Sequence, residues 1–168
     1  MKGPGTVNKK PIVFLDIDGV LNSGMFHEQH IKNNHGLSWR ENNRDYVLEE
    51  KSKPLFDLLE TYSVQVVIIS SWVRSNLSKD SDQIKELQTF FNYSDIIGSL
   101  TTTGSEDRAL DIVKFMEQYS NPWIVLDDAY ELYYINDFPK KHLIVCDGRY
   151  GMGKWELYRL KNMLENST

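Results

Sequence analysis

The sequence predicts a doubly wound α/β fold with a mostly parallel sheet of about five strands and helices on both faces. Short apolar runs, rich in β-branched and aromatic residues, recur along the chain and alternate with segments of helical spacing. Several of these runs lead directly into acidic or hydroxyl side chains. Parallel sheets bind their ligands at the carboxyl ends of the strands, so these polar residues are the candidates for chemistry.

The chain of 168 residues has the length of one domain and is long enough to bury a core. We expect residues 1–10 to be a flexible N-terminus and residues 11–168 to form a single domain. The net charge of −5 argues against a generic electrostatic nucleic-acid binder, but it leaves room for a local basic groove. A single cysteine, Cys146, and the lack of an apolar leader or membrane-spanning stretch predict a cytoplasmic protein.

The first predicted strand covers about residues 11–16 and runs into two acids, Asp16 and Asp18. Residues two apart in extended chain point the same way, so one acid could attack an electrophile while the other transfers a proton. Gly19 permits the chain to leave the sheet sharply. The alternative is an ordinary strand followed by an Asp-Gly turn.

Residues 22–52 show no sustained hydrophobic period, and we predict that they form a short cap or flap over the strand ends. His27, His30 and His35 suggest a metal site, but without cysteines or a dense carboxylate cluster a solvated loop is the better interpretation. Trp39-Arg40 could clamp a substrate or simply pack within the flap.

A helix beginning near Pro54 precedes the second predicted strand, residues 64–69, which ends in Ser70-Ser71. These hydroxyls could bind a phosphate, cap a helix or merely close the strand. Arg74 follows closely and could reach an anion.

The middle of the chain predicts a short helix over residues 81–91, a weak strand over 95–98 and a helix over about 106–119. The core face of the last helix would use Ala109, Ile112, Val113 and Met116. Arg108 lies in its first turn, where a cation opposes the helix dipole. That placement indicates another use for Arg108, although an ordinary surface arginine remains the alternative.

The fourth predicted strand, residues 122–126, runs into Asp127-Asp128, and adjacent carboxylates at a strand end attract Mg²⁺. The fifth, residues 142–146, includes His142 and Cys146, to which we assign structural roles. A loop with three glycines follows, without the strand–loop–helix context of a dinucleotide site. The chain closes with a helix over residues 153–165, with Leu157, Leu160 and Leu164 on its core face.

A parallel sheet brings the ends of these strands together at one edge. The combined set is two acids for covalent catalysis, a hydroxyl and an arginine for phosphate, and further acids for magnesium. Phosphoryl transfer through an aspartyl-phosphate is the reaction class that this set suits.

Across residues 11–153 the chain resembles the haloacid dehalogenase (HAD) superfamily of phosphatases, which has a Rossmann-like fold. Asp16-Ile17-Asp18-Gly19-Val20 is similar to the first HAD motif and Ile69-Ser70 to the second. Arg108 stands where the third motif has a lysine or arginine, and Asp127-Asp128 is similar to the fourth. More narrowly, the first motif with Leu21-Asn22, and Ser70-Ser71-Trp72-Val73-Arg74, resemble the HAD domain of Swiss-army-knife RNA-repair proteins.

The resemblance implies that Asp16 attacks phosphorus and Asp18 first protonates the leaving group and then activates water. It implies phosphate binding by Ser70, Ser71, Arg74 and Arg108. It also implies a Mg²⁺ cofactor held by the carboxylates of Asp16, Asp127 and Asp128 and by the backbone carbonyl oxygen of Asp18. A nucleotide or a nucleic-acid 3′- or 5′-phosphate end would be the substrate.

Two rivals remain in other functional classes. A receiver-type signalling domain would need an aspartate where Ser70 lies and a lysine after the last strand, where Cys146-Asp147 lies, so this rival is weak. The second is a catalytically silent binding or regulatory module on the same scaffold, because a fold does not determine a function.

Overall fold

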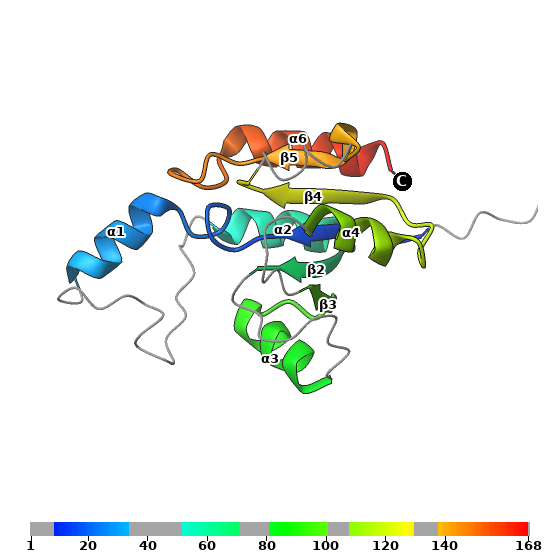
Figure 1. Cartoon of the computed structure of the whole chain (residues 1–168), viewed down its shortest axis with the longest axis horizontal. Coiled ribbons are helices and arrows are strands. Elements are labelled where there is room, and N and C mark those ends of the chain that lie inside the picture. The colour runs from blue at the N-terminus through cyan, green and yellow to red at the C-terminus, as the bar shows by residue number, and fades with distance from the viewer. Residues whose placement is uncertain (1–8, 34–51, 71–80, 101–107, 130–137, 168) are drawn as a thin grey trace, which may run out of the picture.

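A parallel β-sheet forms the centre of the molecule. The computed structural model describes residues 9–33, 52–70, 81–100, 108–129 and 138–167. Within these residues the strands lie in the order β3-β2-β1-β4-β5, and every neighbouring pair is parallel (Figure 1). The strands are β1 (Ile12–Leu15), β2 (Gln65–Ile69), β3 (Ile96–Leu100), β4 (Trp123–Asp127) and β5 (Leu143–Val145). The predicted doubly wound parallel sheet is therefore confirmed.

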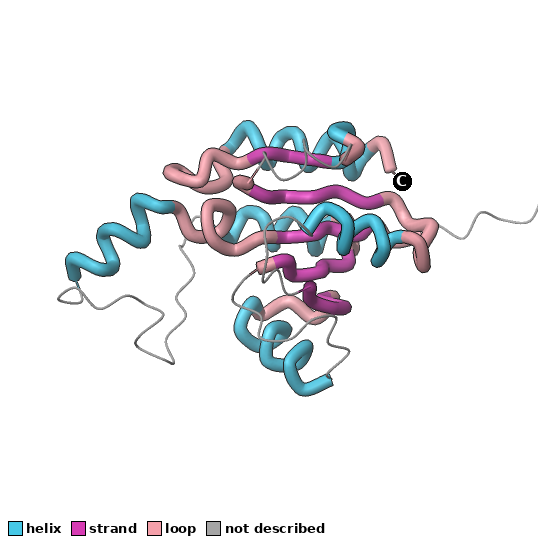
Figure 2. The backbone as a smooth tube through the Cα atoms, viewed as in Figure 1, coloured by secondary structure: helices cyan, strands magenta, loops and turns pink. Residues whose placement is uncertain are grey.

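Helices cover both faces of the sheet (Figure 2). They are α1 (Gly24–Asn33), α2 (Lys53–Thr61), α3 (Ser81–Phe91), α4 (Arg108–Met116), α6 (Lys154–Glu165) and the short 3-10 helix η2 (Lys140–His142). Helix α4 lies in front of the sheet in the view of Figure 1, and α2 and α6 lie behind it. Within the part of the chain that the structure describes, no helix is long and apolar enough to cross a membrane.

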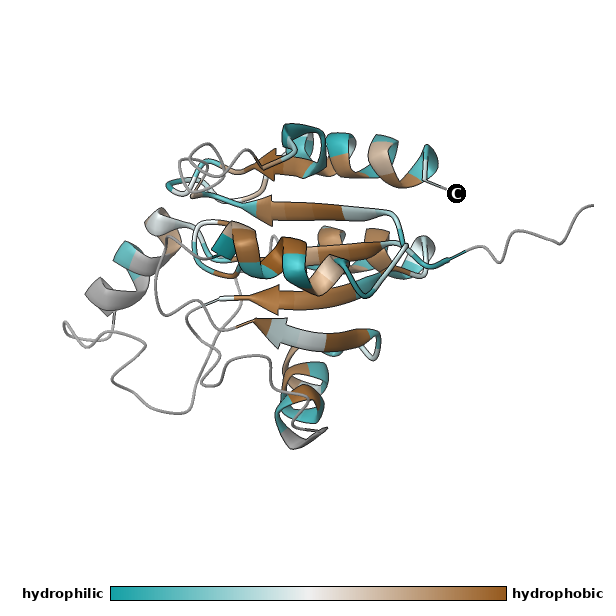
Figure 3. Cartoon of the chain, turned by 45° about the vertical axis from the view of Figure 1, so that its right-hand side comes forward, coloured by the Kyte–Doolittle hydropathy of each residue, from teal (hydrophilic) through white to brown (hydrophobic). Residues whose placement is uncertain are grey.

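The alternation of side chains along β1 divides the core into two layers. Val13 and Leu15 belong to the layer beneath α2 and α6, together with Leu59 and Leu160. Ile12 and Phe14 face the other way, into the layer that α4 closes with Ala109, Ile112 and Met116. The central strands are buried on both faces, and Figure 3 shows them as predominantly hydrophobic.

The order of the strands places a topological switch point between β1 and β4. From β1 the chain moves outward on one side to β2 and β3, then crosses β1 and continues on the other side with β4 and β5. Connections on the two sides leave in opposite directions, so a crevice forms outside the carboxyl ends of β1 and β4. The fold positions a site at the end of these two strands.

One segment differs from the sequence prediction. Residues 22–52 were predicted to form a short cap or flap, and within them Gly24–Asn33 forms helix α1, which the hydrophobic periodicity did not indicate. The Ser23 hydroxyl caps this helix by accepting the Phe26 N–H at 3.1 Å. Its apolar residues, Met25, Phe26 and Ile31, do not recur at helical spacing, which is why periodicity missed it. Residues 34–51, the rest of the predicted cap, lie outside the described residues, as do residues 1–8 of the predicted N-terminus.

Three further sequence predictions concern single side chains, and the structure contradicts the first of them. Val113 was assigned to the core face of α4, but its side chain is 38% exposed. His142 and Cys146 are structural as predicted: His142 Nδ1 lies 2.8 Å from the Trp123 carbonyl oxygen, and the Cys146 thiol is buried.

Phe14 provides a test of this core. Its ring makes edge-to-face contacts with Phe115 and Trp123, at centroid distances of 5.6 and 6.1 Å. Phe14→Ala should lower the free energy of unfolding by about 3–5 kcal/mol, because it removes a fully buried ring and leaves a cavity. Urea denaturation measures this loss. Phe14→Leu, which keeps much of the apolar volume, should cost clearly less; equal costs would contradict the packing described here.

Candidate active site

Two buried carboxylates lie side by side at the switch point. Leu15 of β1 is in register with Leu126 of β4, so the next residues along, Asp16 and Asp127, are neighbours. Adjacent residues of parallel strands point to the same face of the sheet. Both side chains are buried, with exposed fractions of 5% for Asp16 and 0% for Asp127. The predicted pairing of these two strand ends is thus present in the structure.

Arg108 joins the two carboxylates. Its Nη1 lies 3.0 Å from Asp16 Oδ2 and 2.5 Å from Asp127 Oδ2, and its side chain is only 11% exposed. Helix α4 begins at Arg108 and covers the face of the sheet toward which both carboxylates point. A cation in the first turn of a helix is unfavourable to the dipole, but here the ion pairs offset that cost. Arg108 is therefore part of the acidic cluster, and the alternative of an ordinary surface arginine is wrong.

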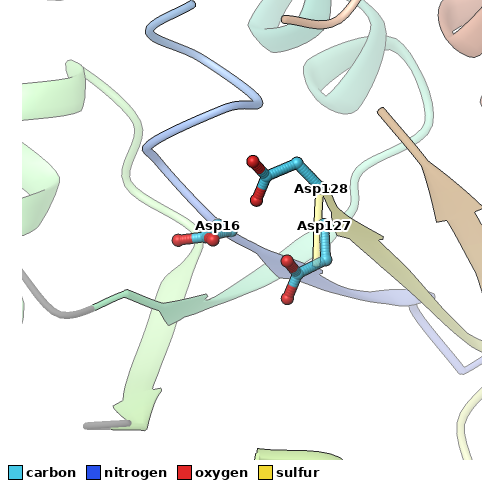
Figure 4. Close-up of side chains that lie close together, drawn as sticks. All are labelled: Asp16, Asp127 and Asp128. Atoms are coloured by element: carbon cyan, nitrogen blue, oxygen red, sulfur yellow. The ribbon is translucent and has the colours of Figure 1, made fainter. Parts of the chain in front are cut away.

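A third carboxylate completes the cluster. Asp16, Asp127 and Asp128 each offer an oxygen within 4.8 Å of the others (Figure 4). Asp128 follows directly after β4, and two glycines crowd its side chain. A Cβ atom on Gly19 would come 2.0 Å from Asp128 Oδ2, and one on Gly148 would come 2.3 Å from it. The Asp128 carboxylate occupies space that only glycine leaves open on both sides.

The turn after β1 is held by its own backbone. The Ile17 carbonyl oxygen accepts N–H groups of Val20, Leu21 and Asn22, at 3.3, 2.8 and 3.0 Å. Gly19 adopts a φ of 76°, which favours glycine, and its N–H donates to the Asn22 carbonyl oxygen at 2.8 Å. From the sequence, an ordinary Asp-Gly turn was the alternative to a functional pair of acids, Asp16 and Asp18. The two are compatible, because the turn positions these acids.

Hydrogen bonds also orient the carboxylates. Asp16 Oδ1 accepts the N–H of Ile17 at 2.7 Å, and Asp127 Oδ1 accepts the N–H of Ala129 at 2.9 Å. Arg108 donates to the Oδ2 atom of each carboxylate, so both oxygens of Asp16 and of Asp127 accept a hydrogen bond. The two buried carboxylates are thus held in one orientation before any ligand binds.

Burial and mutual repulsion make the ionised cluster costly. Burial and the neighbouring Asp127 carboxylate raise the pKa of Asp16 to about 8, although Arg108 and the Ile17 N–H act in the opposite direction. Burial and Asp127 likewise raise the pKa of Asp128 to about 6, and the Asp18 carboxylate adds a smaller repulsion. One arginine does not balance the charge of this cluster, so a further cation would favour its ionised form.

The other predicted site residues divide into two groups. Asp18 is half-buried on the turn, near enough to Asp128 to repel it, and Ser70 is buried at the end of β2, the strand beside β1. Ser71 and Arg74, as well as Trp39-Arg40, lie outside the described residues. The structure therefore brings Asp16, Asp127, Asp128 and Arg108 together and places Asp18 beside them.

The loop after β5, whose Asp147-Gly148 and Gly151 also fit the resemblance to the HAD domain of RNA-repair proteins, approaches the acidic cluster. Gly148 approaches the Asp128 carboxylate, and its carbonyl oxygen accepts the N–H of Gly24 at 2.9 Å. Met152 N–H donates to the Val20 carbonyl oxygen at 2.9 Å. These bonds connect the loop to α1 and to the turn after β1. The Asp147-Gly148 pair after an apolar run is the sequence signal for this loop.

Comparison with known proteins shows the family. Residues 12–156 match the family described as the HAD domain in Swiss Army Knife RNA repair proteins, and the chain belongs to this family. The comparisons with curated proteins and with solved structures found no significant match. The match covers the sheet and the acidic cluster, and membership in the HAD family indicates a phosphatase type of function.

The acidic cluster fits a magnesium ion. Its donors are hard carboxylate oxygens, close enough together to share one ligand, and Mg²⁺ prefers such donors. Burial and repulsion from Asp127 raise the pKa values of Asp16 and Asp128, and the charge of a divalent cation would act against both effects. Asp16, Asp127 and Asp128 are the described residues that could hold the ion.

Gly148 tests this assignment. Gly148→Ala would place a Cβ where the Asp128 carboxylate lies, so the carboxylate must move. We expect Mg²⁺ affinity to fall about tenfold or more, with little loss of stability, because only the end of one side chain is displaced. Isothermal titration calorimetry gives the affinity. The control is Gly98→Ala, whose Cβ would meet its nearest atom at 3.9 Å; unchanged affinity in Gly148→Ala would exclude Asp128 from the metal site.

Proposed function

We propose that the protein is a magnesium-dependent phosphatase that hydrolyses a phosphate monoester through an aspartyl-phosphate on Asp16. The observation that carries this proposal is the buried cluster of Asp16, Asp127 and Asp128, joined by Arg108, at the carboxyl ends of β1 and β4. A carboxylate fixed beside a cation at the carboxyl ends of parallel strands suits attack on phosphorus. When bound, Mg²⁺ supplies positive charge that offsets the repulsion between this carboxylate and the phosphate.

In the first step an oxygen of Asp16 attacks phosphorus, and the bond from phosphorus to the ester oxygen breaks. Arg108 favours the ionised form of Asp16 by opposing the rise in its pKa, and the Ile17 N–H fixes the orientation of the carboxylate. Asp18, two residues further along the turn, gives its proton to the leaving oxygen, so an alcohol departs rather than an alkoxide.

In the second step Asp18, now ionised, accepts a proton from water as the water oxygen attacks the phosphorus of the aspartyl-phosphate. The bond from phosphorus to Asp16 breaks, which releases inorganic phosphate and restores the carboxylate. The Asp18 proton is returned in this step, so the cycle balances. Ser70, at the end of the adjacent strand β2, is assigned to a phosphate oxygen.

The substrate we propose is a nucleotide or a nucleic-acid phosphate end. The family description, which concerns RNA repair proteins, supports this class of substrate. We place Ser71 and Arg74 with the phosphate-binding residues and assign the protein to the cytoplasm, as the sequence analysis expects.

Phosphate release tests the nucleophile. Wild type should release phosphate from an aryl phosphate, mononucleotides or phosphorylated oligonucleotides only when Mg²⁺ is present. Asp16→Asn should lower the rate by at least about a thousandfold, because an amide cannot form the acyl phosphate. Asp95→Asn is the matched control, since this half-buried aspartate pairs with Lys10 before β3, at the opposite edge of the sheet. A wild type that releases no phosphate from any substrate would instead support a silent binding module.

Asp18 has a different expected outcome. Asp18→Asn should lower turnover by about 10²–10⁴-fold, because the amide can neither protonate the leaving oxygen nor accept a proton from water. Mg²⁺ affinity, measured by calorimetry, should stay close to that of wild type, because only the backbone carbonyl of Asp18 is assigned to the metal. If the variant loses magnesium binding, the division of roles between Asp16 and Asp18 is wrong.

A further inference from the structure

Two large aromatic side chains are exposed side by side on α6. Trp155 is 66% exposed and Tyr158 is 56% exposed, and their rings stack at a centroid distance of 5.8 Å and an interplanar angle of 27°. The core face of the same helix is formed by Leu160 and Leu164, which are fully buried. The aromatic pair therefore contributes little to the core, and clustered exposed aromatic surface indicates a binding site.

A third exposed aromatic ring lies just before this helix. Tyr150 is 56% exposed, and the guanidinium carbon of Arg149 lies 5.7 Å from the centre of its ring. Cation–π contact of this kind leaves both a π-face and a positive charge at the surface. We call Arg149, Tyr150, Trp155 and Tyr158 the aromatic surface.

The charge of this segment is opposite to that of the chain as a whole. Residues 149–161 contain the basic residues Arg149, Lys154, Arg159 and Lys161 but only one acidic residue, Glu156, although the whole chain carries a net charge of −5. Arg149, Lys154 and Lys161 are exposed, and Lys161 also pairs with Glu165 at 3.7 Å. Exposed π-faces interspersed with exposed cations are the features with which proteins bind single-stranded nucleic acid. A neutral protein partner would not explain the cations.

The aromatic surface also begins beside the acidic cluster. Gly148, whose backbone approaches the Asp128 carboxylate, directly precedes Arg149. Helix α6 starts at the same edge of the sheet where β4 and β5 end, and it runs back behind the sheet (Figure 1). A strand whose terminal phosphate reached Asp16 could continue past Gly148 onto Tyr150 and Trp155.

We infer that the aromatic surface stacks the bases of a single-stranded nucleic acid whose phosphorylated end enters the site of Asp16. This inference rests on the proposed function, and it narrows the substrate from any nucleotide to a polynucleotide end. The bases stack on Trp155, Tyr158 and Tyr150, and the cations of the segment contact the backbone phosphates. Stacking tolerates any base, so the surface confers no sequence preference.

The test compares Trp155→Ala/Tyr158→Ala with wild type. Fluorescence anisotropy measures the binding of short RNA and DNA single strands, each with and without a terminal phosphate. The double variant should bind them at least about tenfold more weakly, because alanine removes two stacking faces. Tyr119→Ala is the matched control: Tyr119 is 41% exposed and also stacks, on Phe115, but lies beyond the end of α4 away from Arg108. Comparison of the RNA and DNA arms identifies the nucleic acid.

Turnover separates the inference from the proposed function. In the double variant the KM for a phosphorylated oligonucleotide should rise at least about tenfold, while kcat/KM for an aryl phosphate stays at the wild-type value. Absence of aryl phosphate turnover in wild type would overturn the proposed function, and the binding arm would still test the aromatic surface. Equal oligonucleotide affinity in wild type and the double variant would overturn the inference. So would sedimentation showing that the surface instead joins two copies of the chain, with dimers lost in the double variant.

Discussion

The placement of two ionisable acids in a buried position is the constraint on which the rest of the site depends. Asp16 and Asp127 are adjacent in register and almost fully buried, an arrangement that is costly unless opposite charge is present. Arg108 supplies one positive charge from the start of α4. The first turn of this helix is thus fixed over the strand ends by an ion pair as well as by Ala109 and Ile112 in the core. The packing of α4 on the sheet therefore also brings Arg108 to the two carboxylates.

Close approach of backbone to carboxylate is the second constraint. Gly19 and Gly148 come from the turn after β1 and the loop after β5, yet both leave space for the same Asp128 side chain. The hydrogen bond from Met152 N–H to the Val20 carbonyl oxygen joins the two segments directly. Asp128 therefore lies between two backbone segments that are hydrogen-bonded to each other. Such support holds the side chains of a site in position before a ligand binds.

The sequence was sufficient for the strands and for three of the acids. A short apolar run that ends in polar residues is typical of a strand buried on both faces. The sequence alone therefore placed Asp16, Asp127 and Asp128 at one edge of the sheet. The ion pairs of Arg108 could not be predicted, because they join residues 92 and 19 positions apart. Helix α1 was missed because its residues form no apolar stripe, although Ser23 was a suitable cap. Trp155 and Tyr158 were not predicted as an exposed pair, because the leucine spacing of the same helix identifies its core face and not which of its other side chains stack at the surface.

The acidic cluster and the aromatic surface have opposite charge and lie at the same edge of the sheet. A polyanion attracted by Arg149 and Lys154 would meet repulsion from Asp16, Asp127 and Asp128 as its end approached them. A divalent cation in the cluster, together with Arg108, balances the three carboxylate charges and removes that repulsion. Binding of the cation and binding of the phosphorylated end then strengthen one another, and thermodynamic linkage makes the effect equal in both directions. The net negative charge of the chain is consequently no obstacle to a nucleic-acid substrate, because the charge that the ligand meets is local and depends on the bound metal.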